Sequence, residues 1–205
     1  RYLFNLLIAR GCRGRCSFCA IRFAMGTLVS KPLSDILQEF RSGLRQGYTE
    51  FLLIAEDSGS YGLDQGTTFV DLLRALFRSP GPYRLGINDL NPQWVIRYAR
   101  SLIPLMARNA RKLSFCAVPI QSGSNVLLKA MRRNYRIEEL CGDLATLQKK
   151  IPHLPLLTHL MVGFPGETDA DFEQTLALLT RIRFAQVDVF EYTDRPHTVA
   201  SCLPN

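Results

Sequence analysis

Apolar runs of strand length alternate with segments of helical spacing along the whole chain. Near-continuous apolar runs predict six buried strands, at residues 3–9, 50–55, 83–87, 112–118, 154–162 and 184–192. Between them, apolar residues recur three and four positions apart and predict helices over residues 32–46, 67–78, 92–106, 124–131, 137–149 and 169–181. Pro104 is expected to end or kink the third of these helices, because proline lacks the amide hydrogen that a helix interior needs.

This alternation predicts a sheet of parallel strands joined by right-handed crossovers. A doubly wound open sheet and a barrel both satisfy it. Polar or glycine-rich residues follow the first five strands at their C-terminal ends, where barrel enzymes assemble their active sites. We therefore predict the α/β class, specifically a partial (β/α)6 TIM-type barrel of parallel strands that lacks its last helix.

Composition sets wide bounds on the kind of protein. With 205 residues and 47% hydrophobic composition, the chain can bury one sizeable core, which favours a single domain. It starts at Arg1 rather than Met, so we interpret residues 1–205 as one domain of a longer protein. No apolar run reaches 18 residues, and a membrane partner is not expected. The net charge of +7 permits an RNA or anionic partner, although it is also common on an ordinary basic surface.

Cys12, Cys16 and Cys19 form a C-x3-C-x2-C pattern just after the first predicted strand. Three thiolates on a short loop can hold three irons of a 4Fe-4S cluster and leave the fourth iron open for chemistry. A structural zinc site would need a fourth ligand, and the three histidines lie far away in sequence, although not necessarily in space. The remaining cysteines are scattered, and six in all are too few for a disulfide scaffold, so a reducing, cytoplasmic location fits best.

With Phe18 directly before the last cysteine, this pattern resembles the signature of radical S-adenosylmethionine enzymes. The resemblance implies two cofactors, a 4Fe-4S cluster held by the three cysteines and S-adenosyl-L-methionine bound at the open iron. It also implies reductive cleavage to methionine and a 5′-deoxyadenosyl radical, with an external electron donor of the flavodoxin or ferredoxin type. Such chemistry belongs to the cofactors, while the protein binds, orients and shields them.

Further segments resemble the methylthiotransferase branch of that family, namely residues 56–62 (EDSGSYG), 64–67 (DQGT), 119–124 (PIQSGS), 128–135 (LKAMRRNY) and 162–168 (VGFPGET). The start of the first segment and residues 84–88 (RLGIN) are most similar to the archaeal and eukaryotic type. Those enzymes methylthiolate threonylcarbamoyladenosine next to the tRNA anticodon, which implies a transferase with tRNA as its partner.

The resemblance also implies the residues that hold the second cofactor. Glu56 and Asp57 would bind the methionine amino group, or they are exposed loop charges. The methionine carboxylate would pair with Lys129 and Arg132, which could equally be solvated helix charges. Contacts to the ribose, the methionine or the adenine are implied for Phe18, Asn88, Asp89, Gln121, Ser122, Met161, Val162 and Gly163.

Two departures from the branch bear on the substrate. His159 stands where the family usually carries Asp, and we interpret it as a core or supporting histidine. The flanking domain with three further cysteines and the RNA-binding barrel of methylthiotransferases are not within these residues, so sulfur insertion is not assigned to residues 1–205 alone. A radical enzyme acting on a peptide or small molecule, and a non-catalytic cluster-binding module, remain as alternatives.

Overall fold

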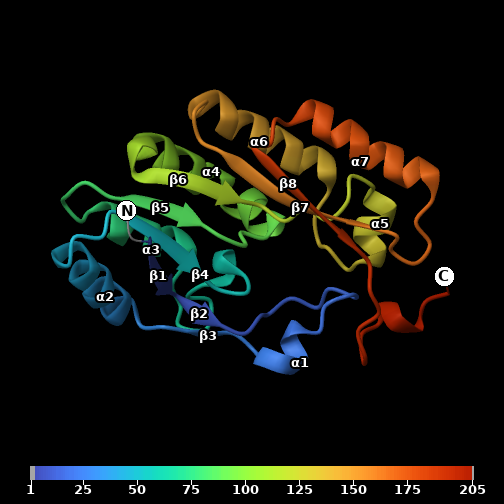
Figure 1. Ribbon diagram of the computed structural model, residues 1–205, viewed down its shortest axis with the longest axis horizontal. Helices are drawn as coiled ribbons and strands as arrows, with labels where there is room; N and C mark the ends of the chain where they lie inside the picture. Colours follow the sequence, from blue (N-terminus) through green and yellow to red (C-terminus); the bar gives the residue numbers. More distant parts are fainter. Residues whose placement is uncertain (1–2, 205) are drawn as a thin grey trace.

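A computed structural model gives the fold of residues 3–204. One parallel sheet follows the order of the chain, β1-β4-β5-β6-β7-β8. Its strands are β1 (Leu3–Leu7), β4 (Glu50–Ile54), β5 (Arg84–Ile87), β6 (Leu113–Ala117), β7 (Leu156–Val162) and β8 (Gln186–Glu191). Because each crossover advances one strand in the same direction, the sheet curves like part of a barrel. β1 and β8 do not pair, so the barrel is open and the predicted partial TIM-type architecture is confirmed (Figure 1).

The helices between the strands are α2 (Leu33–Arg45), α3 (Phe69–Phe77), α4 (Pro92–Arg108), α5 (Asn125–Ala130), α6 (Ile137–Lys150) and α7 (Asp169–Arg181). Figure 1 shows α4, α6 and α7 along the outer side of the sheet. Along β7, buried Thr158 and Leu160 alternate with half-buried His159 and Met161. The continuous apolar pattern is therefore not that of a sheet covered on both faces: the second face lines the half-exposed interior of the open barrel.

Close packing of α2 on the sheet depends on a glycine. A methyl group at Gly43 would lie 2.8 Å from the ring of Phe51, so only a residue without a side chain lets this helix approach β4. Phe51 then packs with Phe40 and Tyr83, at ring-centroid distances of 4.5 and 6.4 Å. This aromatic group belongs to one continuous core whose residues come from elements between β1 and α7.

Pro104 does not end α4, which continues to Arg108. Because proline has no amide hydrogen, the carbonyl of Arg100 receives no hydrogen bond from position 104. Arg100 is exposed, so water can bind this carbonyl instead. Leu102, Ile103, Leu105 and Met106 are buried on either side of the proline, and their packing holds the helix together.

The first predicted strand is two strands in the structure. β1 ends at Leu7, and β2 (Ala9–Arg10) then leaves the main sheet to pair antiparallel with β3 (Val29–Ser30). The cysteines and the short helix α1 (Ile21–Met25) lie in the loop that this pair closes. Three 3-10 turns complete the described elements, η1 (Ser58–Ser60), η2 (Ala110–Lys112) and η3 (Ala200–Cys202). None of the helices within residues 3–204 is long and apolar enough to cross a membrane.

Candidate active site

The cysteine loop is closed tightly at its base. Gly11 has a left-handed backbone (φ +72°), and a Cβ there would lie only 2.1 Å from the carbonyl oxygen of Thr27. The amide of Cys12 donates to the carbonyl of Gly26 at 3.2 Å. Because the two ends of the loop touch through backbone alone, its position relative to the sheet depends on a residue without a side chain at position 11.

Two of the three cysteine sulfurs lie beside a second glycine, Gly14. The Gly14 amide donates to Cys12 Sγ at 3.2 Å, and a Cβ on Gly14 would lie 3.1 Å from that sulfur and 3.9 Å from Cys16 Sγ. Burial raises the pKa of the Cys12 thiol to about 11 and also raises the pKa of Cys19. Within residues 3–204 no group of three ligand side chains is closed into a finished metal site. The thiols would have to draw together and lose their protons as a metal binds.

Two neighbours of the cysteines attach the loop to the rest of the fold. Ser17 donates from its amide to the Met131 carbonyl at 3.0 Å and from its hydroxyl to the Ala130 carbonyl at 2.8 Å. Phe18 packs against a small apolar cluster that includes Met131 and Phe164. The loop is thereby held against the end of α5 and the turn after β7.

The loop after β4 supports the base of the cysteine loop. Asp64 Oδ2 accepts from the Ser30 amide at 2.8 Å, and the Ser30 hydroxyl accepts from the Gly62 amide at 2.8 Å. Residues of the 56–67 region therefore brace β3. These hydrogen bonds give a structural reason for the carboxylate at position 64.

At the end of β4, Asp57 is buried, with 2% of its surface exposed, and accepts a 2.7 Å hydrogen bond from Trp94 Nε1. Its other oxygen, Oδ1, is buried without a hydrogen-bond partner, and so is Oε2 of Glu56. Burial raises the pKa of Asp57 to about 6, against the lowering effects of the Trp94 hydrogen bond and the Arg133 charge. The end of β4 thus presents two unsatisfied acceptors that a bound cation or amine would satisfy.

The end of β5 carries a second acidic group. Asp89 has a left-handed backbone (φ +48°) and accepts from Asn88 Nδ2 at 2.6 Å. Burial raises its pKa, as does the charge of Glu56, while His159 and Asn88 act in the opposite sense. His159 itself lies 3.6 Å from Asp188 on β8. The structure therefore brings Glu56, Asp89 and His159 together on the inner face of the sheet.

The two residues predicted after β6 differ in their surroundings. Gln121 has a left-handed backbone (φ +78°), and its main chain exchanges hydrogen bonds with the main chains of His159 and Met161, both at 2.8 Å. Ser122 is fully buried, and its hydroxyl lies 3.3 Å from that of Thr175 and accepts from the Ser124 amide at 3.1 Å. The structure thus places Ser122 in a supporting position and does not bring its side chain to the other predicted residues.

Both predicted cations line one cleft beside the cysteine loop. This cleft, of about 480 Å³, lies between the loop, the start of α4 and the end of α5, and its walls include Cys16, Lys129 and Arg132. The Lys129 and Arg132 side chains are exposed, whereas the next residue, Arg133, is buried, with its Nη1 3.6 Å from Cys16 Sγ.

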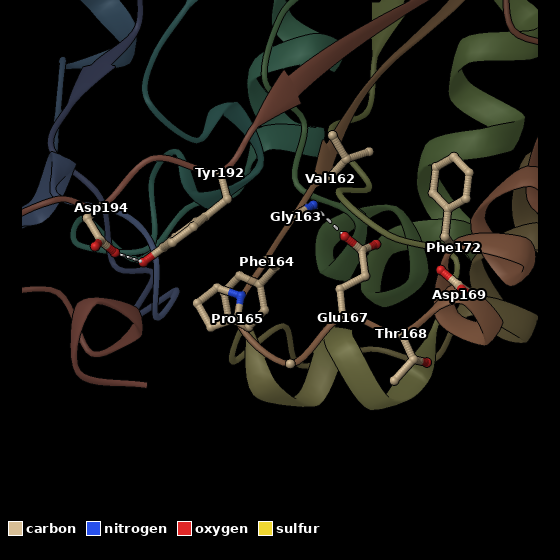
Figure 2. Close-up of a pocket in the computed structure, with 11 residues that line it drawn as sticks. Val162, Gly163, Phe164, Pro165, Glu167, Thr168, Asp169, Phe172, Tyr192 and Asp194 are labelled. Carbon is tan, nitrogen blue, oxygen red and sulfur yellow. Dashed lines mark hydrogen bonds between the residues drawn. The ribbon is translucent and has the colours of Figure 1, made fainter. Parts of the chain in front are cut away.

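A second cleft, of about 530 Å³, lies at the end of β7 (Figure 2). Val162 and Gly163 form one wall, and the Gly163 amide donates to the carboxylate of Glu167. Tyr192 lies across the cleft and donates to Asp194 at 2.7 Å. A strand end, a glycine turn and an aromatic ring make a site suited to a flat ring system.

Residues 6–179 match the sequence model of the Radical SAM superfamily, and this range includes the cysteine loop and the ends of the first five strands of the sheet. The chain belongs to the Radical SAM superfamily. Its members use a 4Fe-4S cluster and S-adenosylmethionine, and these are the cofactors of this chain. The triad fits that assignment because it offers three free thiols on one short loop, and two of them, those of Cys12 and Cys16, lie beside Gly14.

Individual relatives are named for more specific activities. The chain is 38% identical over 198 residues to a probable threonylcarbamoyladenosine tRNA methylthiotransferase of Pyrococcus abyssi, a match that covers 97% of this chain and 46% of that protein. It is 35% identical over 204 residues to the ribosomal protein uS12 methylthiotransferase RimO of Chlamydia abortus, covering 98% and 44%. The chain thus spans less than half the length of these relatives.

Among solved structures, the fold is similar to the radical S-adenosylmethionine methyltransferase TsrM from Kitasatospora setae, which was determined with cobalamin and a 4Fe-4S cluster bound. The TM-score is 0.79 at 18% identity, over 97% of this chain and 38% of that one. At that identity the likeness concerns the fold alone, and it agrees with the open radical SAM barrel described above.

Two residues of this radical SAM site are not among the sequence predictions. Trp94 holds Asp57 from a position 37 residues away, and Arg133 reaches Cys16 across 117 residues. No motif around Trp94 in the sequence indicates a role in the site. Arg133 could have been suspected because it stands beside the predicted Arg132, but the sequence does not show which of the two adjacent arginines turns inward.

Proposed function

We propose that this chain is the catalytic core of a radical S-adenosylmethionine methylthiotransferase that modifies an adenosine of tRNA near the anticodon. The observation that carries the proposal is the cleft in which the cysteine loop meets polar residues from the start of α4 and the end of α5, in a chain 38% identical to a protein named for that activity. When bound, the cluster supplies one electron for cleavage of S-adenosylmethionine to methionine and the 5′-deoxyadenosyl radical.

The chain's own residues would bind and orient the second cofactor. The unsatisfied oxygens of Glu56 and Asp57 suit the methionine amino group, since both are acceptors that lack a donor. Lys129 and Arg132, exposed in the cleft beside Cys16, suit the carboxylate. The cleft formed by Val162, Gly163 and Tyr192 suits the adenine ring (Figure 2).

Arginines around the cysteine loop support a nucleic-acid substrate. Arg13, Arg15 and Arg22 line two further clefts at the cysteine loop. None of these three side chains has a hydrogen bond or an ion pair with another described residue. The charge of Arg13 does lower the pKa of Asp64, which lines one of the same clefts. Cations beside a reactive centre would position a phosphate backbone, and the resulting affinity should fall steeply with salt.

A protein substrate is the second candidate, because a relative of similar identity is named for ribosomal protein uS12. The first test is anaerobic reconstitution with iron and sulfide, followed by reduction in the presence of S-adenosylmethionine. We expect 5′-deoxyadenosine from the wild-type protein and none from Cys16→Ser. Cys141→Ser serves as the matched control, because Cys141 lies on α6 outside the triad.

The substrate is decided by offering the reconstituted protein either tRNA that carries threonylcarbamoyladenosine or a uS12 peptide. More 5′-deoxyadenosine with tRNA supports the tRNA proposal, and more with the peptide supports the second candidate. A wild-type protein that binds the cluster but makes no 5′-deoxyadenosine under any condition is a non-catalytic cluster-binding module.

A further inference from the structure

Arg133 is a buried cation with an unusual set of partners. It is 9% exposed, and its Nη2 donates to the Pro119 carbonyl. Its Nη1 lies 3.6 Å from Cys16 Sγ, within hydrogen-bonding distance of a sulfur, and its Nε is buried without a partner. The guanidinium carbon lies 5.9 Å from the centre of the Tyr135 ring. The side chain is therefore held on several sides and aimed at one cysteine of the triad.

No carboxylate neutralises this charge directly. Among residues 3–204, Arg133 forms no ion pair with a carboxylate. Its charge lowers the pKa of Asp57 and of Cys19 from a distance, and Tyr135 and Cys16 raise the pKa of Arg133 itself. An unpaired buried charge costs several kcal/mol, so a fold that keeps one has an anion for it elsewhere. The Cys16 sulfur is the candidate, because it becomes a thiolate when it ligates iron.

The backbone fixes the distance between the arginine and the cysteine. α5 ends in a Schellman turn, in which Arg132 takes a left-handed backbone (φ +56°) and the Arg133 amide donates to the Leu128 carbonyl at 2.8 Å. The same helix end accepts both hydrogen bonds of Ser17, the residue after Cys16. Both partners are therefore attached to one rigid element, so their approach is a built feature of the fold.

We propose that Arg133 is a positioning residue for the cluster: it donates a hydrogen bond to the Cys16 sulfur and raises the reduction potential of the cluster. Three thiolates outweigh the charge of the oxidised cubane, so the loaded site is an anion, and it gains a second negative charge on one-electron reduction. A fixed positive charge at a ligand sulfur stabilises the reduced form more than the oxidised form. Hydrogen bonds to the sulfurs and nearby charge are established determinants of such potentials.

The inference rests on the cluster held by the triad and not on the identity of the substrate. Its test is a potentiometric titration of the reconstituted protein, with the reduced cluster followed by electron paramagnetic resonance. For Arg133→Gln we expect the equilibrium constant for one-electron reduction to fall about tenfold, which is a potential about 59 mV more negative. Arg133→Lys keeps the charge but loses the planar fork, so its potential should lie between the two.

Arg111→Gln is the matched control. It removes one positive charge from an exposed residue in η2, which precedes β6 and so lies at the opposite end of the sheet from the cysteine loop. Its potential should equal that of the wild type. If Arg133→Gln also titrates at the wild-type potential, the proposal is wrong, whatever happens to activity.

A second measurement decides the case in which Arg133→Gln does not fold or does not load. Wild-type protein labelled with nitrogen-15 arginine should show a guanidinium nitrogen coupled to the spin of the reduced cluster by pulsed resonance, and Arg133→Lys should lose that coupling. Absence of the coupling in the wild type, or its persistence in Arg133→Lys, would overturn the inference. Formation of 5′-deoxyadenosine is scored separately, so failure of the proposed function and failure of this inference are distinguishable.

Discussion

Replacing Asp57 by Asn should change how the stability of the metal-free protein depends on pH. The carboxylate is almost fully buried, one oxygen accepts from Trp94 at 2.7 Å, and the other has no partner. Asn has nearly the same shape and still offers an oxygen to the indole. The substitution therefore removes the charge with little change in packing.

The sign and the size follow from the raised pKa of Asp57, about 6 in the folded protein against an ordinary value of 3.8. The folded state holds this proton more tightly than the unfolded state does. The free energy of unfolding contributed by Asp57 therefore falls as the pH rises from 3.8 to about 6, and the loss is constant above that. The rise in pKa corresponds to about 3 kcal/mol.

The assay is urea unfolding of the metal-free wild type and of Asp57→Asn at intervals from about pH 4 to about pH 7. Subtracting the two curves removes every other titrating group. The wild type should lose about 3 kcal/mol relative to the variant across this range. Asp35→Asn, at an exposed position in the first turn of α2, controls for the change in net charge. A difference that stays constant with pH would refute the reasoning.

Three further outcomes are expected. Gly11→Ala should abolish iron loading, because its methyl group would meet the Thr27 carbonyl at 2.1 Å; Gly26→Ala, which shares the left-handed backbone (φ +77°) but meets nothing within 4 Å, should still load. Ser124→Ala should lower the free energy of unfolding by about 1–2 kcal/mol in denaturant titration, because Ser124 caps α5 and donates to Asp171. The Ser124 and Thr168 hydrogen bonds lower the pKa of Asp171, so its contribution is complete above pH 3.8 and lost as the pH falls through the lowered value; Asp171→Asn should flatten this acid limb of the stability curve.

Most of the sheet was predictable from the sequence. Strands packed under helices are short, nearly continuous apolar runs, whereas the helices are longer segments with apolar residues three and four positions apart. The predicted 169–181 helix agrees with α7 at both ends, and the structure adds a capping box of Thr168 and Asp171 at its start. The interruption at Ile8 was not predictable. Ala9 and Arg10 leave the main sheet and pair with Ser30 and Val29, which belong to a separate segment after the cysteine loop.

The site divides in the same way. The cluster ligands and the polar strand ends could be predicted from the sequence. An iron–sulfur cluster requires cysteines at a close spacing, and the active-site end of a barrel requires polar residues after its strands. Ser122 looked equivalent to Gln121 in the sequence, yet its hydroxyl is turned into the α5–α7 junction. The alternation of buried and half-buried residues also needed the structure, since both faces of β7 are mostly apolar.

The sequence by itself determined the triad, the parallel α/β architecture and the strand ends that carry the polar residues, because these are properties of residue type and local order. The tertiary structure alone decided which of two neighbouring arginines faces the cysteines. Arg132 takes the left-handed position of the Schellman turn and stays exposed, and the turn reverses the chain so that Arg133 points inward at Cys16. That choice depends on how the end of α5 docks against a loop more than 100 residues earlier, which no local pattern encodes.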